Sequence, residues 1–318
     1  MECLKFKEID QVVIGEGESA MLEIIEGNKD RIIIGQMLDF EKLPWPDREI
    51  IRNERNILVA YKDNKKRITS FQSHRGCAFR CVYCADGNRV MCGGLKPSIR
   101  YRDTNNLLDE MEFVTHGFKL DLLKFCDATW NLSPGWVIDF CKEKIRRGFT
   151  IPFYPNIHPG MKTCTEEMFA FMAEANCFEV AIGVESGSEK ILKQVGKGTN
   201  RESISRCVLL ARKAGIKKIR GYFILGMPEE SEADVRETES FAEELDLDEY
   251  GFTLLCPYPG TMMHDPNVHA NIRWETTDEY GNDFWHTNYL TNQQLKDHQK
   301  RLVEKFKRRL TWHHKQLP

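Results

Sequence analysis

The stretch His74-Arg75-Gly76-Cys77-Ala78-Phe79-Arg80-Cys81-Val82-Tyr83-Cys84-Ala85-Asp86-Gly87 determines how the rest of the chain is interpreted. It places three cysteines at the spacing C-x3-C-x2-C. The residues directly before it, Ile68 to Gln72, have the composition of a short strand. Three thiols within one short loop converge on a common centre, and convergent thiolates are usual ligands of zinc or of an iron–sulfur cluster.

The spacing is compatible with a zinc site and with an iron–sulfur cluster, but the two need different numbers of protein ligands. A structural zinc site is closed by four ligands, and the nearest further cysteine is Cys92, eight residues after Cys84. A [4Fe–4S] cluster held by Cys77, Cys81 and Cys84 alone keeps one iron free of protein ligands. Chemistry can take place at that iron.

Composition restricts the class of protein. The chain has 318 residues, a formal net charge of −3 and a pI of about 6.3, so no general attraction to nucleic acid or to an anionic membrane is expected. No apolar run approaches the roughly 18 residues that a membrane helix needs. Eleven cysteines are dilute in a chain of this length, and no signal peptide is recognised. A reducing cytoplasm is therefore the expected location, because a cluster needs free thiolates.

From residue 68 onward, strand-like and helix-like segments alternate, which predicts an α/β fold with parallel strands. Strands are expected at 68–72, 122–128, 150–157, 178–184, 219–225 and 250–255. Helices are expected to begin after Asp103, Ser133, Thr163, Thr199 and Ser231. Residues 291–315 are expected to form a basic amphipathic helix.

With Tyr83 just before its last cysteine, the motif resembles the signature of the radical S-adenosylmethionine (SAM) enzymes. Three further fragments resemble the B12-type and Elp3-like branch of that superfamily: Gly183-Val-Glu-Ser-Gly-Ser188, Ile224-x-Gly226-x-x-Glu229 and Cys256-Pro-Tyr-Pro-Gly-Thr261. The resemblance implies a partial (β/α)6 TIM-type barrel over residues 68–260, which carries a [4Fe–4S] cluster and SAM.

The segments that flank this barrel are interpreted separately. Asp10–Glu18 and Leu43–Arg48 resemble the junction that follows the cobalamin-binding domain in B12-type proteins. Only nine residues precede that junction, and the motif D-x-H-x-x-G does not occur, so no cobalamin is expected. Residues 1–67 are interpreted as a cap and linker, with 51–67 as a solvated connector or hairpin. Residues 261–318 are interpreted as a C-terminal extension.

In α/β barrels the reacting groups lie at the carboxyl ends of the strands. That rule selects the candidates Asp127, Asn156, His158, Glu185, Ser186, Gly226 and Tyr258. Among these, Asp127 and Tyr258 are the catalytic candidates. A carboxylate that closes an apolar strand, such as Glu185, is costly unless it is paired.

The resemblance assigns cofactor contacts to several of these residues. Glu185 and Ser186 would hold the ribose or methionyl part of SAM, and Lys197 would pair with its carboxylate. Asp127 would bind the SAM amino group or the substrate, while Tyr83 and Gly226 belong to the cofactor-binding motifs. The alternative for Lys197 is an exposed lysine at a helix end.

Three functions are compatible with the sequence. The first is a cobalamin-free radical SAM enzyme that abstracts hydrogen from a small biosynthetic substrate, leading to rearrangement, epimerisation, elimination or C–C bond formation. The second is a radical SAM methyltransferase that uses cobalamin held elsewhere, and the third is a non-catalytic metal-binding scaffold. Both enzyme functions imply a one-electron donor such as flavodoxin or ferredoxin. Neither a membrane nor nucleic acid is an expected partner.

Overall fold

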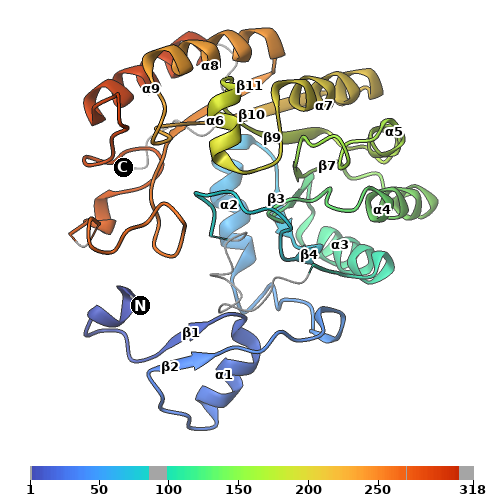
Figure 1. Ribbon diagram of the computed structural model, residues 1–318. Coiled ribbons are helices and arrows are strands. Elements are labelled where there is room, and N and C mark those ends of the chain that lie inside the picture. The colour runs from blue at the N-terminus through green and yellow to red at the C-terminus, as the bar shows by residue number, and fades with distance from the viewer. Residues whose placement is uncertain (1, 86–98, 270, 308–318) are drawn as a thin grey trace.

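The computed structural model describes residues 2–85, 99–269 and 271–307. Its centre is a curved wall of parallel strands (Figure 1). The strands are β3 (Ile68–Phe71), β6 (Leu122–Phe125), β7 (Phe153–Tyr154), β8 (Asn156–Ile157), β9 (Glu179–Glu185), β10 (Lys218–Leu225) and β11 (Glu249–Leu254). β3, β6 and β7 form one parallel ladder and β8 to β11 form another, and Pro155 separates β7 from β8. One expected strand is therefore two short strands, because proline cannot donate to the ladder.

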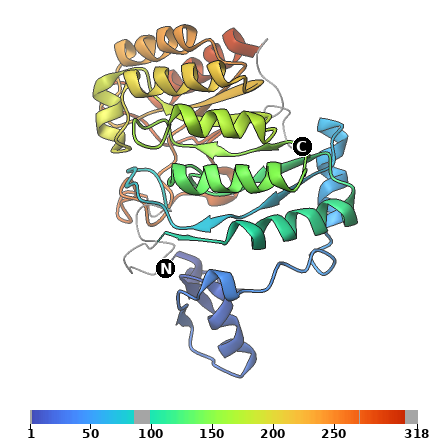
Figure 2. The ribbon, with the colours of Figure 1, turned by 90° about the vertical axis from the view of Figure 1, so that its right-hand side faces the viewer.

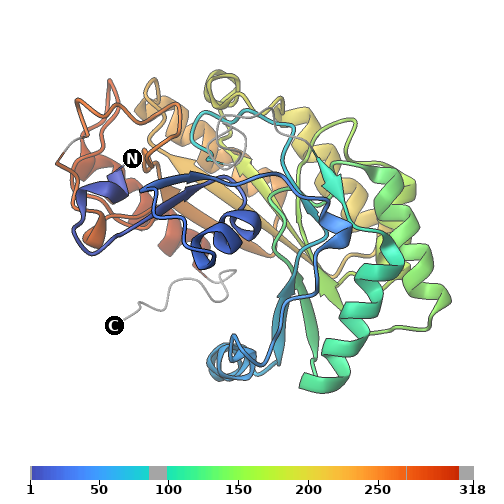
Figure 3. The same cartoon turned by 90° about the horizontal axis from the view of Figure 1, so that it is seen from below.

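Helices connect these strands and cover the outer side of the wall (Figure 2). They are α3 (Thr104–Phe118), α4 (Pro134–Arg146), α5 (Glu166–Glu174), α6 (Glu189–Val195), α7 (Arg201–Ala214), α8 (Glu232–Leu245) and α9 (Asn292–Phe306). In the described residues no ladder joins β3 to β11, so the barrel is open. The α/β partial-barrel prediction is confirmed, and Figure 3 shows the crescent from below.

The core between the wall and its helices is aromatic. Phe125 on β6 meets Phe140 of α4 and Phe153 of β7 edge to face, at ring centroid distances of 5.6 and 5.7 Å. Trp130, in the loop after β6, is fully buried against the same rings. Such pairs add stability beyond the area that they bury, so this cluster fixes the loop that follows β6.

Two of the predicted helix starts are displaced. The Thr163 hydroxyl donates to the carbonyls of His158 and Gly160, so Thr165 caps α5 by accepting from the Met168 amide at 3.1 Å. Asn200, not Thr199, caps α7, and it forms a reciprocal capping box with Ser203. The predicted caps Asp103, Ser133 and Ser231 are confirmed.

A small N-terminal unit lies apart from the barrel (Figures 1 and 2). After the turn η1 (Glu2–Lys5), the parallel strands β1 (Val12–Ile14) and β2 (Ile32–Ile34) are joined by α1 (Gly17–Ile25). The turn η2 (Phe40–Lys42) follows. The expected connector at 51–67 is instead largely the helix α2 (Asn53–Asn64). Ile57, fully buried, anchors that helix against the core beside β3, which a solvated connector would not do.

Acidic residues of this unit meet the segment that precedes the cysteines. There β4 (His74–Arg75) pairs antiparallel with β5 (Arg100–Tyr101). Glu18 accepts from Arg75 at 2.6 Å, and Glu16 accepts from both Arg75 and Arg100. The fragment that resembles a domain junction thus holds the arm that leads into the cysteine loop.

The C-terminal segment closes the β11 side of the barrel. It passes through the turn η3 (Trp274–Thr276) into α9, whose Gln299 donates to the Phe252 carbonyl of β11. Arg301 and Lys305 both pair with Glu239 of α8 at 2.7 Å. Basic residues of α9 are therefore paired with acidic residues of the neighbouring helix α8. Among the helices that the structure describes, none is long and apolar enough to cross a membrane.

Candidate active site

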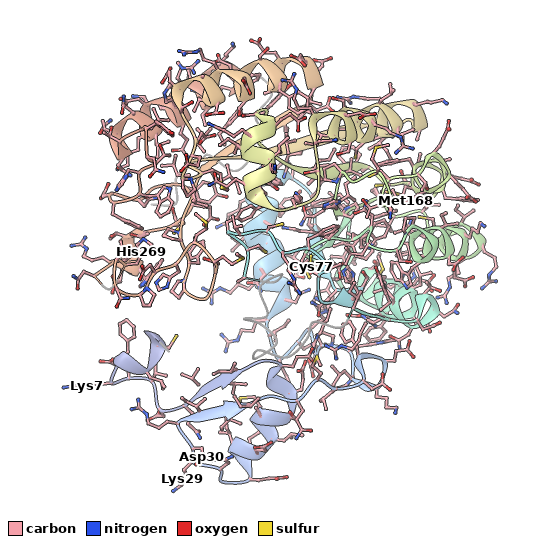
Figure 4. All side chains as sticks on the ribbon, viewed as in Figure 1. Lys7, Lys29, Asp30, Cys77, Met168 and His269 are labelled. Carbon is pink, nitrogen blue, oxygen red and sulfur yellow. The ribbon has the colours of Figure 1, made fainter. Side chains whose placement is uncertain are left out.

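A cavity of about 780 Å³ follows the inner face of the barrel. At the carboxyl ends of the strands it is lined by Cys77, Cys81 and Cys84. It continues to the amino ends, where Lys66 precedes β3 and Lys218 begins β10. Such a volume is typical of small-molecule sites, and its position agrees with the strand-end rule. Figure 4 labels Cys77 near the middle of the molecule.

Asp127, in the loop after β6, fixes the start of the cysteine loop. Its Oδ1 accepts from the backbone amides of Ser73 and His74 at 2.8 and 2.9 Å. The side chain is buried and does not line the cavity. The structure therefore places this predicted SAM or substrate contact beneath the loop, where it holds the backbone that leads to Cys77.

The middle of the loop rests on His158, which follows β8. The Phe79 ring stacks on the His158 ring at a centroid distance of 3.7 Å and an interplanar angle of 4°. Burial, helped by Lys197, lowers the pKa of His158 to about 4, so the ring is neutral. Its Nε2 lies 3.1 Å from the Lys197 carbonyl, which can only accept. One imidazole thus connects the cysteine loop to the Lys197 backbone.

Glu185 and Lys197 form a buried pair beside the cysteines. The Lys197 ammonium donates to Glu185 Oε1 at 2.6 Å and to the Gly183 carbonyl at 2.8 Å. Glu185 ends β9 with a φ of +68°, a conformation that non-glycine residues rarely adopt. A Cβ at Gly183 would collide with both charged groups, so glycine leaves room for the pair. Lys197 is therefore not the exposed lysine of the alternative interpretation.

Tyr83 completes this group. Its pKa lies well above its usual value, because the side chain is buried and the Glu185 charge lies close by. Tyr83, Glu185 and Lys197 all line the cavity that the cysteines line. The predicted residues Tyr83, Glu185 and Lys197 are therefore brought together.

The donor set fits an iron–sulfur cluster. Burial raises the pKa of Cys81 to about 12, so that thiol becomes a thiolate at neutral pH only when a cation replaces its proton. In the described residues no three Cys, His, Asp or Glu side chains stand close enough for a single ion. A cubane core keeps its cysteine ligands further apart than a tetrahedral zinc does, so the three cavity-lining thiols suit the cluster better. Cys92 lies outside the described residues.

Besides Asp127 and His158, three further predicted residues do not line the cavity. The Ser186 hydroxyl lies 3.0 Å from that of Thr238 on α8. Gly226 has a φ of +105°, and its carbonyl accepts a hydrogen bond from the Trp285 indole at 2.7 Å. The Tyr258 hydroxyl donates to Glu279, which does line the cavity, so Tyr258 lies one residue behind the surface.

Three described histidines of the C-terminal segment lie outside this cavity. None of His264, His269 and His286 lines the cavity, and Figure 4 shows His269 well away from Cys77. Residues that the sequence analysis did not identify do line it, among them Phe79, Lys124, Tyr154 and Tyr222. Period-two alternation along the strands was the signal that would have found the last three.

Comparison with protein families places this site in a known group. Residues 71–242 match the model of the radical SAM superfamily. An uncharacterised methyltransferase of Pyrococcus horikoshii is 28% identical over 281 residues, which cover 83% of this chain and 59% of that protein. The bacteriochlorophyllide d C-12(1)-methyltransferase of Chlorobaculum tepidum is 27% identical over 212 residues, covering 65% and 44%. The chain thus spans about half the length of these curated relatives.

Solved structures agree on the fold. The radical SAM methyltransferase TsrM from Kitasatospora setae, solved with cobalamin and a [4Fe–4S] cluster bound, matches with a TM-score of 0.56 and 24% identity. That match covers 65% of this chain and 37% of TsrM. The cobalamin-dependent SAM radical enzyme OxsB matches with a TM-score of 0.59 and 18% identity, over 95% of this chain and 46% of OxsB.

The family match spans the cysteine loop, the Glu185–Lys197 pair and five of the barrel strands. It covers more than half of the chain. The prediction from the cysteine spacing and its surroundings is confirmed: this chain belongs to the radical SAM superfamily, whose members use SAM and a [4Fe–4S] cluster.

Proposed function

We propose that this chain is an enzyme that reductively cleaves SAM and abstracts a hydrogen atom from a small biosynthetic substrate held inside the barrel. The observation that carries the proposal is the continuity of the cavity. The three cysteines, the Glu185–Lys197 pair and the inner strand residues all line one space of about 780 Å³. A cofactor at the cysteine end and a substrate further in would therefore share that space.

The proposed roles follow from these positions. Cys77, Cys81 and Cys84 hold the cluster. Glu185 accepts hydrogen bonds from the SAM ribose or amino group, and Lys197, next to it, faces the SAM carboxylate. Asp127 acts as a positioning residue for the loop, because its carboxylate is used by backbone amides.

When bound, the cluster and SAM supply a 5′-deoxyadenosyl radical and methionine from one electron delivered by a donor such as a flavodoxin or a ferredoxin. The chain's own contribution is to orient and to shield. The His158–Phe79 stack and the Asp127 hydrogen bonds keep the cysteine loop in place. The barrel wall excludes bulk water from the space where the substrate loses its hydrogen atom.

The test is SAM cleavage by anaerobically reconstituted protein with a chemical reductant. We expect 5′-deoxyadenosine and methionine in equal amounts, and a broad absorbance near about 400 nm from the cluster. Replacing Cys77, Cys81 or Cys84 with alanine should abolish both signals. The matched control is Cys126→Ala, because Cys126 is exposed and does not line the cavity. Cys92→Ala should also retain the cluster.

Two results would contradict the proposal. Loss of the cluster in Cys92→Ala would mean that four cysteines hold the metal, leaving no open iron for SAM. Iron and sulfide binding with no 5′-deoxyadenosine, even with an efficient reductant, would favour the non-catalytic scaffold.

A second candidate function is methyl transfer with cobalamin held by another protein or domain. Two observations favour it: relatives that carry methyltransferase names, and the exposed apolar surface of the N-terminal unit. Formation of S-adenosylhomocysteine in step with product would support this function over the first.

We expect the chain itself to bind no cobalamin, since its sequence lacks the motif D-x-H-x-x-G. Equilibrium dialysis against hydroxocobalamin measures this directly. Binding of one cobalamin per chain with micromolar or tighter affinity would contradict the expectation and place the methyltransferase function first.

A further inference from the structure

One wall of the cavity carries polar side chains that the protein itself does not use. Lys124 on β6, Tyr154 on β7 and Asn156 on β8 line the cavity from neighbouring strands. Lys124 and Tyr154 are register partners across the β6–β7 ladder. Among the described residues, none offers a hydrogen bond or an ion pair to any of these three side chains.

The other cavity cations are already bound. Lys197 is paired with Glu185. Lys218 and Arg220 share two carboxylates at the amino ends of the strands, those of Glu179 and Glu249, at distances of 2.5 to 3.1 Å. Lys66 lies over the Phe178 ring at 4.5 Å. Lys124 is therefore the ammonium without an ionic or aromatic partner on the described cavity surface.

Among the described residues, no cavity-lining carboxylate forms an ion pair with Lys124. The cavity-lining carboxylates are Glu179, Glu185 and Glu279. The first two are neutralised by the pairs above, and Glu279 accepts from the Tyr258 hydroxyl. The wall thus presents three kinds of donor in a half-buried place: an ammonium, a phenol and an amide. Such a set matches a group with several acceptor oxygens and a negative charge.

We propose that Lys124, with Tyr154 and Asn156, binds the carboxylate or phosphate group of the substrate. This inference names the substrate class and rests on the proposed function, in which the substrate occupies the barrel interior. Lys124 lies on the strand that leads to Asp127 and Thr129, and Thr129 touches Cys77 with its hydroxyl 3.9 Å from the sulfur. An anionic group held at Lys124 would leave the rest of the substrate to extend toward the cysteine end, where its hydrogen is removed.

The test measures anion binding by the reconstituted holoenzyme with SAM present. The probes are propionate and inorganic phosphate, with propionamide as the neutral analogue and chloride at equal ionic strength as the salt control. The affinity is read from the rise of the thermal unfolding midpoint with probe concentration. We expect a rise with an anion and none with propionamide. The probe with the tighter affinity identifies the group as carboxylate or phosphate.

Variants assign the effect to this wall. Lys124→Met should weaken the anion roughly ten- to a hundred-fold, as loss of a charge-assisted hydrogen bond does. Tyr154→Phe should weaken it less. The matched control is Lys217→Met, an exposed lysine just before β10 that does not line the cavity. SAM affinity should be equal in all these variants.

Three outcomes would overturn the inference. One is a wild-type protein that neither anion stabilises more than chloride does. Another is a Lys124→Met variant that keeps the full anion response. The third is loss of SAM affinity in that variant, which would assign Lys124 to the cofactor. The 5′-deoxyadenosine assay is independent of all three, so failure of the proposed function remains distinguishable from failure of this inference.

Discussion

The barrel and the N-terminal unit use the same construction but differ in what covers it. Both join parallel strands through a helix. In β9 nearly every residue is buried, as parallel strands with both faces covered require. In the N-terminal unit, Ile34 of β2 is 54% exposed, and Leu22 and Ile25 of α1 are 61% and 76% exposed.

The two regions are consequently held by different forces. The barrel is stabilised by a contiguous apolar core that includes Phe125, Trp130 and Phe153. The N-terminal unit buries little and is attached through Glu16 and Glu18 to arginines near the cysteine loop. Strand pairing without burial therefore contributes little to the stability of a sheet. In the barrel, buried apolar side chains stabilise the sheet, whereas the N-terminal unit is attached by ion pairs.

The largest effect should come from opening the barrel core. We expect Phe125→Ala to lower the free energy of unfolding by about 3–5 kcal/mol, because it leaves a cavity among buried rings. Urea denaturation measures this. Ile25→Ala is the control and should stay within about 0.5 kcal/mol. An equal loss from Ile25→Ala would show that the α1 surface is covered in solution.

The pH dependence of stability should have opposite signs in the two regions. Burial raises the pKa of Glu230, in the loop after β10, to about 8 from its usual 4.5. The folded state therefore keeps a proton that the unfolded chain has lost, and stability falls as pH rises from about 4.5 to about 8. Across that range the free energy of unfolding should fall by a few kcal/mol, and Glu230→Gln should remove this pH dependence.

In the N-terminal unit, the hydrogen bond from Arg75 lowers the pKa of Glu18. Its contribution is therefore present above its unfolded pKa and is lost as pH falls through the folded pKa. Urea denaturation curves at a series of pH values compare the two variants. Glu230→Gln should change the slope above pH 4.5, and Glu18→Gln should change it below pH 4.5. A Glu230→Gln variant that keeps the wild-type slope would show that Glu230 is ionised in the fold.

Inside the barrel, the Glu185 carboxylate should contribute to SAM binding. Glu185→Ala should weaken SAM binding by about 1.5–3 kcal/mol, the scale of a charge-assisted hydrogen bond in a buried site. Equilibrium binding to cluster-loaded protein measures this, and circular dichroism should stay near wild type. The control is Glu202→Ala, an exposed carboxylate in the first turn of α7. Unchanged SAM affinity in Glu185→Ala would give Glu185 a structural role only.

The smallest effect should come from the attachment of the N-terminal unit. The Glu16 and Glu18 ion pairs are partly buried but lie at the attachment and not in the barrel core. Surface ion pairs contribute about 0.2–1 kcal/mol each, so Glu16→Gln with Glu18→Gln should change barrel stability little. Hydrogen exchange should rise in residues 12–34, while β9 and β10 keep their protection. Faster exchange in the barrel strands as well would show that the two regions unfold together.

Some features followed from local sequence because their physics is local. The helix caps Asp103, Ser133 and Ser231 depend on residues within a turn of one another. Two predictions failed because another contact competed, nearby in the chain for Thr163 and from the core for the connector at 51–67. The Thr163 hydroxyl donates to the carbonyls of His158 and Gly160 in the turn before it and so does not cap α5. Ile57 packs into the core, which stabilises a helix where a solvated connector was expected.

The sequence by itself identified the superfamily, because the cysteine spacing with Tyr83 and three further fragments all resemble it. It also predicted Cys77, Cys81 and Cys84 as the cluster ligands. It also determined the parallel α/β architecture, since alternating periodicities specify it. Only the tertiary structure decided which strand-end residues face the cavity. It directs Asp127 to the loop amides and Ser186 to α8, because the direction of a side chain after a strand end depends on the curvature and register that all the strands set together.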